Sequence, residues 1–138
     1  AQSKLIIIVA VKPMDKATFK LLKHNLPGPF TFLLPASNKV PKLYKSKKDI
    51  VGIRIPNNNI PLQIVEELGE PLMTTSLRNT HDELLDYMVD PQQIFDMFNK
   101  QVDVIIDGGL GNMEASTIVD CTNNEPLIIR EGKGELVG

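Results

Sequence analysis

The sequence predicts an α/β domain with a mixed parallel and antiparallel sheet flanked by helices, and three observations support this. Of the 138 residues, 42% are hydrophobic and 23% are charged, a composition that can bury a core. Segments with helical spacing alternate with β-rich segments, which favours parallel strands. Two β-rich runs near the end are joined by a short polar turn, which predicts an antiparallel hairpin. We expect a single domain over residues 1–138.

Prolines and glycines mark the ends of the first predicted elements. The apolar run from Leu5 to Val11 predicts a buried strand. Asp15 can cap a helix over residues 16–24, and Leu26-Pro27-Gly28-Pro29 must end that helix. Phe30 to Leu34 then has the composition of a strand.

A basic segment, residues 39–48, separates this strand from the next and is expected to be a loop or a short helix. Residues 51–55 alternate aliphatic side chains with Gly52 and Arg54, so they predict a strand on which Arg54 faces away from the aliphatic side chains. The residues after Arg54 lead into a second helix.

This second helix is expected over residues 62–68, with Pro61 at its first position and Gly69 as its stop. Residues 71–76 predict a strand that ends in hydroxyl groups. Residues 77–89 predict a polar, acidic loop.

The last third of the chain predicts one helix and three strands. Asp90-Pro91 opens the helix, with the aspartate placed as its cap. Residues 102–106 predict a strand that runs into a turn at residues 107–109. Residues 116–122 and 127–130 predict the terminal hairpin.

The net charge of −2 conceals two opposite halves. Residues 1–54 contain eleven Lys and Arg against two acids, or about +9, whereas residues 55–138 contain four against fifteen, or about −11. A basic half can form a patch that attracts phosphates. Complementary halves of one fold can also simply neutralise each other.

Several classes of protein and site are not expected. Cys121 is the single cysteine, so no internal disulfide forms, and we expect a cytoplasmic protein in which this thiol is packed and inert. The longest apolar run, residues 5–11, is far shorter than the roughly 20 residues of a membrane span. His24 and His81 fit no ligand pattern, so no protein-bound metal is expected. Walker, Gly-x-Gly-x-x-Gly and Gly-x-Ser-x-Gly sequences are absent.

Three candidate sites remain, each with an ordinary structural alternative. Residues 74–76 place hydroxyls at a predicted strand end, where open α/β sheets bind ligands, although threonine is also a common strand residue. Arg54 and Arg130 lie in predicted strands and suit bidentate binding of carboxylate or phosphate, or a solvated sheet face. A lysine cluster with Tyr44 inside it suits nucleic acid or a solvated loop, and its members are Lys39, Lys42, Lys45, Lys47 and Lys48.

Six short motifs stand in a characteristic order along the chain. They are Pro27-Gly28-Pro29-Phe30-Thr31-Phe32, Gly52-Ile53-Arg54-Ile55-Pro56, Pro71-Leu72-Met73-Thr74-Thr75-Ser76, Asp107-Gly108-Gly109, Ser116-Thr117-Ile118-Val119-Asp120 and Ile129-Arg130-Glu131-Gly132. In this order they resemble the YrdC family over about residues 15–135. The resemblance implies a twisted, open sheet with a concave, positively charged cavity, which agrees with the basic first half.

Family members with an assigned function are threonylcarbamoyl-AMP synthases. They join L-threonine, bicarbonate and ATP into threonylcarbamoyl-adenylate and pyrophosphate, for the N6-threonylcarbamoyladenosine modification of tRNA. The resemblance implies this nucleotidyltransferase activity, with Mg²⁺ bound to the nucleotide. The implied site residues are Ser76, Arg130, Thr74 and Thr31 for the ATP phosphates, Arg54, Ser116 and Thr117 for threonine, and Lys42, Lys45, Lys47 and Lys48 for RNA.

The chain departs from the synthase pattern in two places. Ser76-Leu77-Arg78-Asn79 replaces the family's Ser-x-Asn, and resembles the YciO branch more closely. The family's N-terminal threonine-rich motif and its Lys-x-Arg motif have no match, so we expect an N-terminally incomplete domain. The alternative hypothesis is a non-catalytic protein of the same fold that binds double-stranded RNA or tRNA.

Overall fold

The computed structural model describes residues 11–42, 45–77, 89–111 and 114–138. They divide into two compact units, one from Ala1–Met73 with Ser116–Gly138 and the other from Thr74–Ala115. The prediction that the chain is one domain stays a prediction. None of the helices in the described ranges has the length and apolar character needed to cross a membrane.

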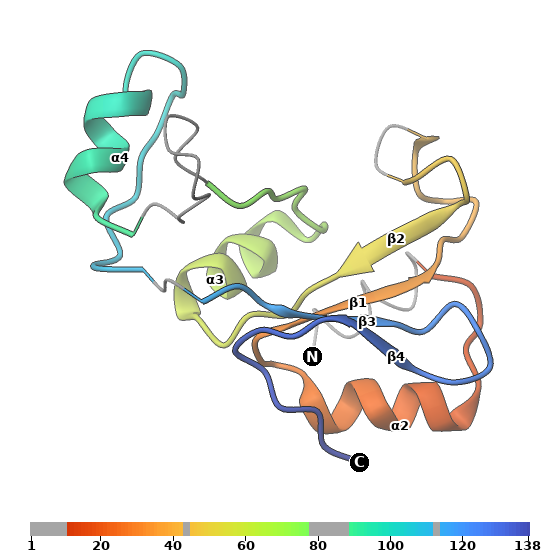
Figure 1. Cartoon of the computed structure of the whole chain (residues 1–138). Helices are drawn as coiled ribbons and strands as arrows, with labels where there is room; N and C mark the ends of the chain where they lie inside the picture. The colour runs from red at the N-terminus through yellow and green to blue at the C-terminus, as the bar shows by residue number, and fades with distance from the viewer. Residues whose placement is uncertain (1–10, 43–44, 78–88, 112–113) are drawn as a thin grey trace. The chain divides into compact units, whose positions relative to one another are not determined.

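The first unit is built on a four-stranded mixed sheet (Figure 1). Its strands are β1 (Phe30–Pro35), β2 (Ile50–Ile53), β3 (Thr117–Asp120) and β4 (Leu127–Arg130), in the order β2-β1-β3-β4. The central strands β1 and β3 are parallel, and each outer strand pairs antiparallel with its neighbour. The predicted mixed sheet and terminal hairpin are therefore confirmed.

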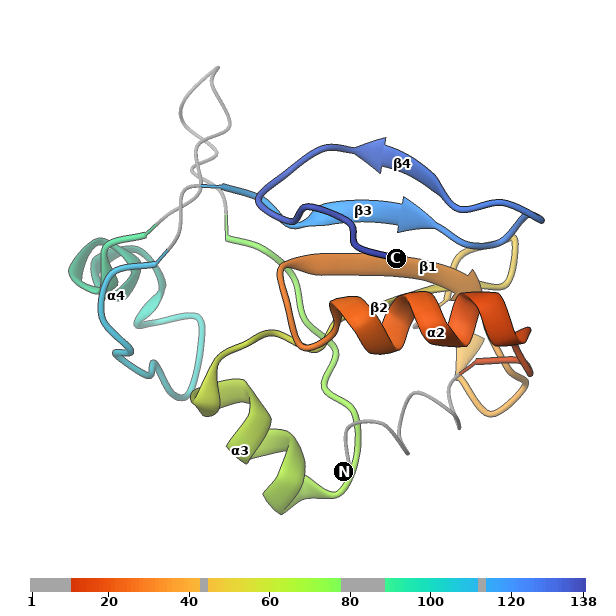
Figure 2. The ribbon, with the colours of Figure 1, turned by 90° about the horizontal axis from the view of Figure 1, so that it is seen from below.

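One face of this sheet is covered by helix α2 (Lys16–Asn25), as Figure 2 shows. On β1, Phe30, Phe32 and Leu34 are buried and alternate with half-buried residues. These side chains form the core with Leu21 and Leu22 of α2 and with the remaining buried members of the cluster, Val11, Leu26, Ile55, Val119 and Cys121. Because strand residues alternate between faces, the residues between them belong to the opposite face of the sheet.

Helix α2 begins and ends as the sequence predicts. The Asp15 side chain accepts a hydrogen bond from the Thr18 backbone N–H at 2.7 Å and caps the first turn. The helix ends at Asn25, before the Leu26-Pro27 bond, which is cis. The following turn is held by the Gly28 N–H, which donates to the Ile55 carbonyl at 2.9 Å.

Helix α3 (Asn59–Leu68) begins earlier than predicted. The Asn58 side chain caps it by accepting from the Ile60 N–H at 2.9 Å, so Pro61 is the third helical residue and not the first. Proline fits there because the first N–H groups of a helix have no partner within it. Gly69 ends the helix with φ of 72°, as predicted.

Two predicted strands are wrong. Residues 71–76 and 102–106 form no strand, and their apolar side chains include the exposed Met73, Val104 and Ile106. Strand composition alone does not make a strand, since each also needs a backbone partner. The sheet of the first unit pairs only β1 to β4 among the described residues.

Other boundaries differ less. Strand β2 ends at Ile53, two residues before its predicted end. Of the predicted strand at residues 5–11, only Val11 is described, and it forms a single antiparallel bridge with Ala36. Tyr44 and residues 78–88, which include Arg78, Asn79 and His81, lie outside the described residues.

The second unit contains helix α4 (Pro91–Phe98). Asp90 caps it as predicted, accepting from the Gln92 N–H at 3.0 Å. The predicted turn at residues 107–109 is confirmed, because Gly109 has φ of 87° and its N–H donates to the Asp107 side chain at 2.9 Å.

Candidate functional site

The candidate site lies on the face of the sheet opposite to α2. Thr31 alternates with the buried Phe30 and Phe32, and it is paired with Ile118 of β3. Ile118 is in turn paired with Arg130 of β4. Paired residues on neighbouring strands share a face, so three strands present Thr31, Ile118 and Arg130 side by side.

Ser116, which directly precedes β3, holds the Arg130 guanidinium. Its backbone carbonyl accepts from Arg130 Nε at 3.1 Å and from Nη2 at 2.8 Å. Its hydroxyl Oγ also accepts from Nη2, at 3.1 Å. The guanidinium is therefore fixed along its Nε–Nη2 edge by one residue.

The Ser116 hydroxyl also joins this pair to the central strand. Thr31 Oγ1 and Ser116 Oγ lie 2.9 Å apart and share a hydrogen bond. All three side chains are half-buried. Thr31, Ser116 and Arg130 thus form one connected group, which we call the Arg130 cluster.

The charge in the Arg130 cluster is not neutralised by an acid. No described carboxylate forms an ion pair with Arg130, and its bonds along the Nε–Nη2 edge leave Nη1 free of described partners. Asp120, at the other end of β3, is bound by the Thr122 hydroxyl at 2.6 Å and by its N–H at 2.9 Å. These two hydrogen bonds hold the pKa of Asp120 below its ordinary value, and the bond from the Thr122 hydroxyl has the larger effect. A half-buried guanidinium without a carboxylate partner is suited to bind an anion.

Arg54 is the second arginine predicted on a strand, and it is exposed. It follows Gly52 by two residues, on the side that alternation gives to the Arg130 cluster, and within the described chain it forms no hydrogen bond or ion pair. A Cβ on Gly52 would lie 3.3 Å from the Thr31 methyl group. The glycine therefore leaves room for Thr31. A glycine inside an alternating strand often marks such a close approach, so the sequence held a signal for this contact.

Thr117 lies on the other face from Ser116. It is 1% exposed, its hydroxyl donates to the Gly134 carbonyl at 2.7 Å, and it accepts from the Gly132 N–H at 3.1 Å. These contacts hold the segment after β4 against the sheet. The predicted contact of Thr117 with threonine stays a prediction.

Thr74 and Ser76 belong to the second unit, where both are exposed. The strand predicted to present them does not form, because residues 71–76 have no regular secondary structure. Their contact with ATP phosphates stays a prediction.

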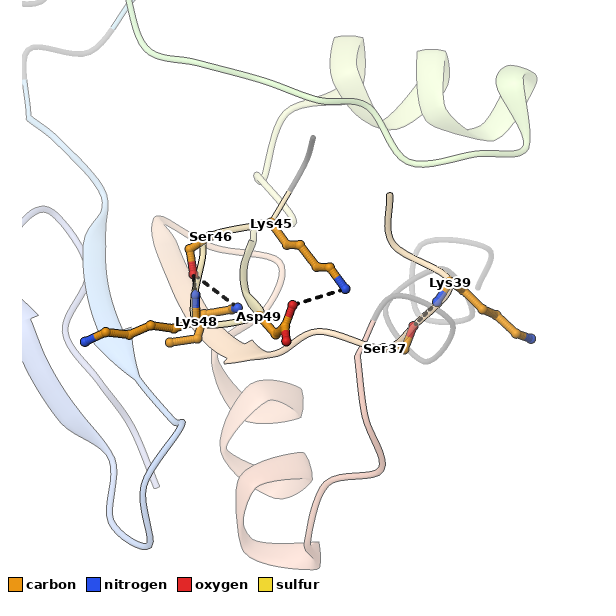
Figure 3. Close-up of polar contacts among 7 residues, drawn as sticks. Ser37, Lys39, Lys45, Ser46, Lys48 and Asp49 are labelled. Atoms are coloured by element: carbon orange, nitrogen blue, oxygen red, sulfur yellow. Dashed lines mark hydrogen bonds and ion pairs between the residues drawn. The ribbon is translucent and has the colours of Figure 1, made fainter. Parts of the chain in front are cut away.

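The lysine cluster lies in the connection between β1 and β2 (Figure 3). The Ser46 hydroxyl accepts from the backbone N–H groups of Lys48 at 3.3 Å and Ile50 at 3.2 Å, which makes a compact turn. Lys45 Nζ lies 3.3 Å from Asp49 Oδ1, and the Lys45 side chain is only 13% exposed.

The other lysines of this cluster face solvent. Lys42 and Lys47 are exposed, and Figure 3 shows that the side chains of Lys39 and Lys48 extend away from the turn. The structure thus separates Lys45, which is paired with an acid, from the four exposed lysines.

A protein-family model matches almost the whole chain. The Sua5_yciO_yrdC model, described as telomere recombination, matches residues 4–132. The chain belongs to the Sua5/YciO/YrdC family. The uncharacterized protein YciO of Escherichia coli K12 is 39% identical over 124 residues, which cover 89% of this chain and 59% of that relative. A threonylcarbamoyl-AMP synthase of Pyrococcus abyssi is 28% identical over 125 residues, covering 90% of this chain and 36% of the synthase.

Solved structures of the family agree with the fold. The crystal structure of E. coli YciO matches with a TM-score of 0.87 at 35% identity, covering 96% of this chain and 63% of that one. P. abyssi Sua5 complexed with L-threonine matches with a TM-score of 0.80 at 28% identity, covering 91% of this chain and 36% of that one. The chain therefore spans about 59% of its YciO relative and less of the synthase.

Proposed function

We propose that the Arg130 cluster binds the phosphates of ATP, and that the whole protein makes threonylcarbamoyl-adenylate for tRNA modification. The observation that carries this proposal is the half-buried Arg130 guanidinium, which is fixed by Ser116 and has no described carboxylate partner. Fixed guanidinium groups bind phosphate oxygens without having to reorganise.

The reaction needs a second anion site, for the threonine carboxylate. Arg54 is exposed, lacks a described acidic partner and follows the strand next to Thr31. P. abyssi Sua5, which matches this fold, binds L-threonine. We propose that Arg54 binds the carboxylate of threonine, with Ser116 beside the same ligand.

Threonine and bicarbonate condense to a carbamate with loss of water. A carbamate oxygen then attacks the α-phosphorus of ATP, and pyrophosphate leaves with the electrons of the broken P–O bond. Mg²⁺ enters with the triphosphate as part of the substrate. The role of the protein is to align the reactants and to stabilise the charge on the phosphates.

Titration of Mg²⁺-ATP into the protein, followed by calorimetry, tests the phosphate site. Arg130→Lys should weaken binding by about tenfold, because a lysine cannot reproduce the guanidinium geometry. Lys133→Ala, an exposed basic position nearby in sequence, is the matched control and should leave the affinity unchanged. Equal affinity of the wild type and Arg130→Lys would contradict the site.

Pyrophosphate release from the whole protein tests the reaction. Release should require threonine and bicarbonate together, and Arg130→Ala should abolish it. Release that continues without threonine would contradict the synthase proposal.

The lysine cluster favours a second function, the binding of double-stranded RNA or tRNA without catalysis. Its four exposed lysines, Lys39, Lys42, Lys47 and Lys48, all lie in the connection between β1 and β2 and carry positive charge there. If they contact phosphates, the affinity for tRNA should fall steeply with salt, because counterions are released on binding. An affinity that does not change with salt would contradict this function.

A further inference from the structure

The Arg130 cluster contains a residue whose role differs from that of its neighbours. Thr31 makes no described contact with Arg130 itself. Its hydroxyl lies 2.9 Å from Ser116 Oγ, and the same Oγ accepts from Arg130 Nη2 at 3.1 Å. Thr31 can therefore act on the guanidinium only through Ser116.

A serine hydroxyl without a second partner would rotate freely. Arginine is only a donor, so Ser116 Oγ accepts from Nη2 and keeps its own proton for a further bond, while the contact with Thr31 fixes the remaining direction. The hydroxyl is thus held between two strands.

Thr31 is itself firmly placed. It lies on central strand β1, which pairs on both sides with β2 and β3. Its methyl group faces Gly52, where a Cβ would approach to 3.3 Å. A β-branched side chain also has few rotamers, so its hydroxyl makes a rigid reference point.

We propose that Thr31 is a positioning residue, which through Ser116 Oγ sets the orientation in which Arg130 meets an anionic ligand. This rests on the proposed function, with the triphosphate as the ligand. Thr31 thereby differs from its predicted role as a direct phosphate contact. Nε and Nη2 of Arg130 both donate to the Ser116 carbonyl, so Nη1 is the group left to bind the anion.

NMR of the arginine Nε–Hε groups tests the positioning without any ligand. The chain has three arginines, so the Arg130 signal can be assigned with Arg130→Lys. Thr31→Val keeps the shape of the side chain and removes its hydroxyl, and it should shift the Arg130 signal and speed exchange of its Hε with water several-fold. Thr31→Ser keeps the hydroxyl and should leave both close to wild type. An unchanged Arg130 signal in Thr31→Val would overturn the proposal.

ATP binding then separates an indirect role from a direct contact. Thr31→Val should weaken Mg²⁺-ATP binding by about tenfold in the wild-type background and should have no further effect in Arg130→Lys. Full additivity of the two losses would overturn the proposal, since it would mean that Thr31 touches the nucleotide itself.

Two other outcomes can also be interpreted, namely misfolding of Thr31→Val and an unchanged affinity of Arg130→Lys for ATP. If Thr31→Val does not fold, Ser116→Ala removes the same bridge and should shift the Arg130 signal in the same way. If Arg130→Lys binds ATP as well as wild type does, the proposed phosphate site is wrong, while the NMR result still decides whether Thr31 positions Arg130.

Discussion

The side-chain amide of Asn25 binds the backbone of Val137 through both of its polar groups. Asn25 Nδ2 donates to the Val137 carbonyl at 2.7 Å, and the Val137 N–H donates to Asn25 Oδ1 at 2.9 Å. Nδ2 also donates to the Leu21 carbonyl at 2.7 Å. One buried side chain thus ties the end of the chain to the last turn of α2.

We expect Asn25→Ala to lower the free energy of unfolding by about 1–3 kcal/mol, because the three hydrogen bonds of this buried side chain, two to Val137 and one to Leu21, are lost. Urea unfolding followed by circular dichroism measures this change. Lys23→Ala, an exposed change on the same helix, is the control and should shift the midpoint little. Equal midpoints for the two variants would show that the Asn25 contacts do not stabilise the fold.

Gly134 is needed for a close approach and not for its backbone angles. A Cβ at this position would lie 2.7 Å from Cζ of the Phe30 ring and 2.9 Å from the Pro29 carbonyl oxygen. Gly134→Ala should therefore destabilise the protein by about 1–3 kcal/mol through overpacking against the core.

The thermal midpoint of Gly134→Ala, compared with that of the exposed neighbour Lys133→Ala, measures this effect. A midpoint for Gly134→Ala at or above that of wild type would contradict this prediction, because it would mean that the Phe30 ring moves aside without loss of stability.

Local signals in the sequence predicted the helices well. Asp15 and Asp90 cap α2 and α4 as expected, because a capping side chain needs only the backbone two or three residues ahead. The start of α3 was misplaced because proline suits several positions in a first turn, and only the Asn58 contact decides between them.

The strands depended on information that is not local. Residues 30–34 and 102–106 both have strand composition, but among the described residues only the first segment pairs with neighbouring strands. Pairing between distant segments sets which apolar run becomes a strand, and composition does not record it.

The sequence predicts the residues of the Arg130 cluster but not their contacts, because these contacts also depend on pairing between distant segments. The hydrogen bond from Arg130 to the Ser116 carbonyl depends on the register of the β3–β4 hairpin. This register shifts between Ile118 and Val119. The opposite directions of Ser116 and Thr117 follow from strand alternation and could have been predicted.

Cys121 should react slowly while the protein is folded. The side chain is 8% exposed. Burial raises the pKa of the thiol from its ordinary 9.0 to about 11, and the negative charge of Asp120 adds a smaller effect in the same direction. At about pH 8 iodoacetamide should modify the urea-unfolded protein much faster than the native one, as mass spectrometry can follow. Equal rates would show that the thiol is accessible.

The same thiol predicts a change of stability in alkali. A raised pKa favours the neutral thiol in the folded state, so its contribution is complete below the unfolded pKa near 9.0 and is lost as pH rises towards about 11. Cys121→Ala should remove this part of the pH dependence. Parallel stability curves for wild type and Cys121→Ala in this range would contradict it.

The lysine cluster offers a charge test in which neighbouring residues give opposite results. Lys47 is exposed, and Lys47→Gln should lower the slope of log affinity for tRNA against log salt by about one. Lys45 is paired with Asp49 at 3.3 Å, so Lys45→Gln should change the slope much less. Asp49 has φ of 56°, a conformation that asparagine also tolerates, so Asp49→Asn should keep the turn, free Lys45 and steepen the slope. Equal slopes for Lys45→Gln and Lys47→Gln would mean that tRNA responds to net charge alone and not to the exposed lysines of this turn.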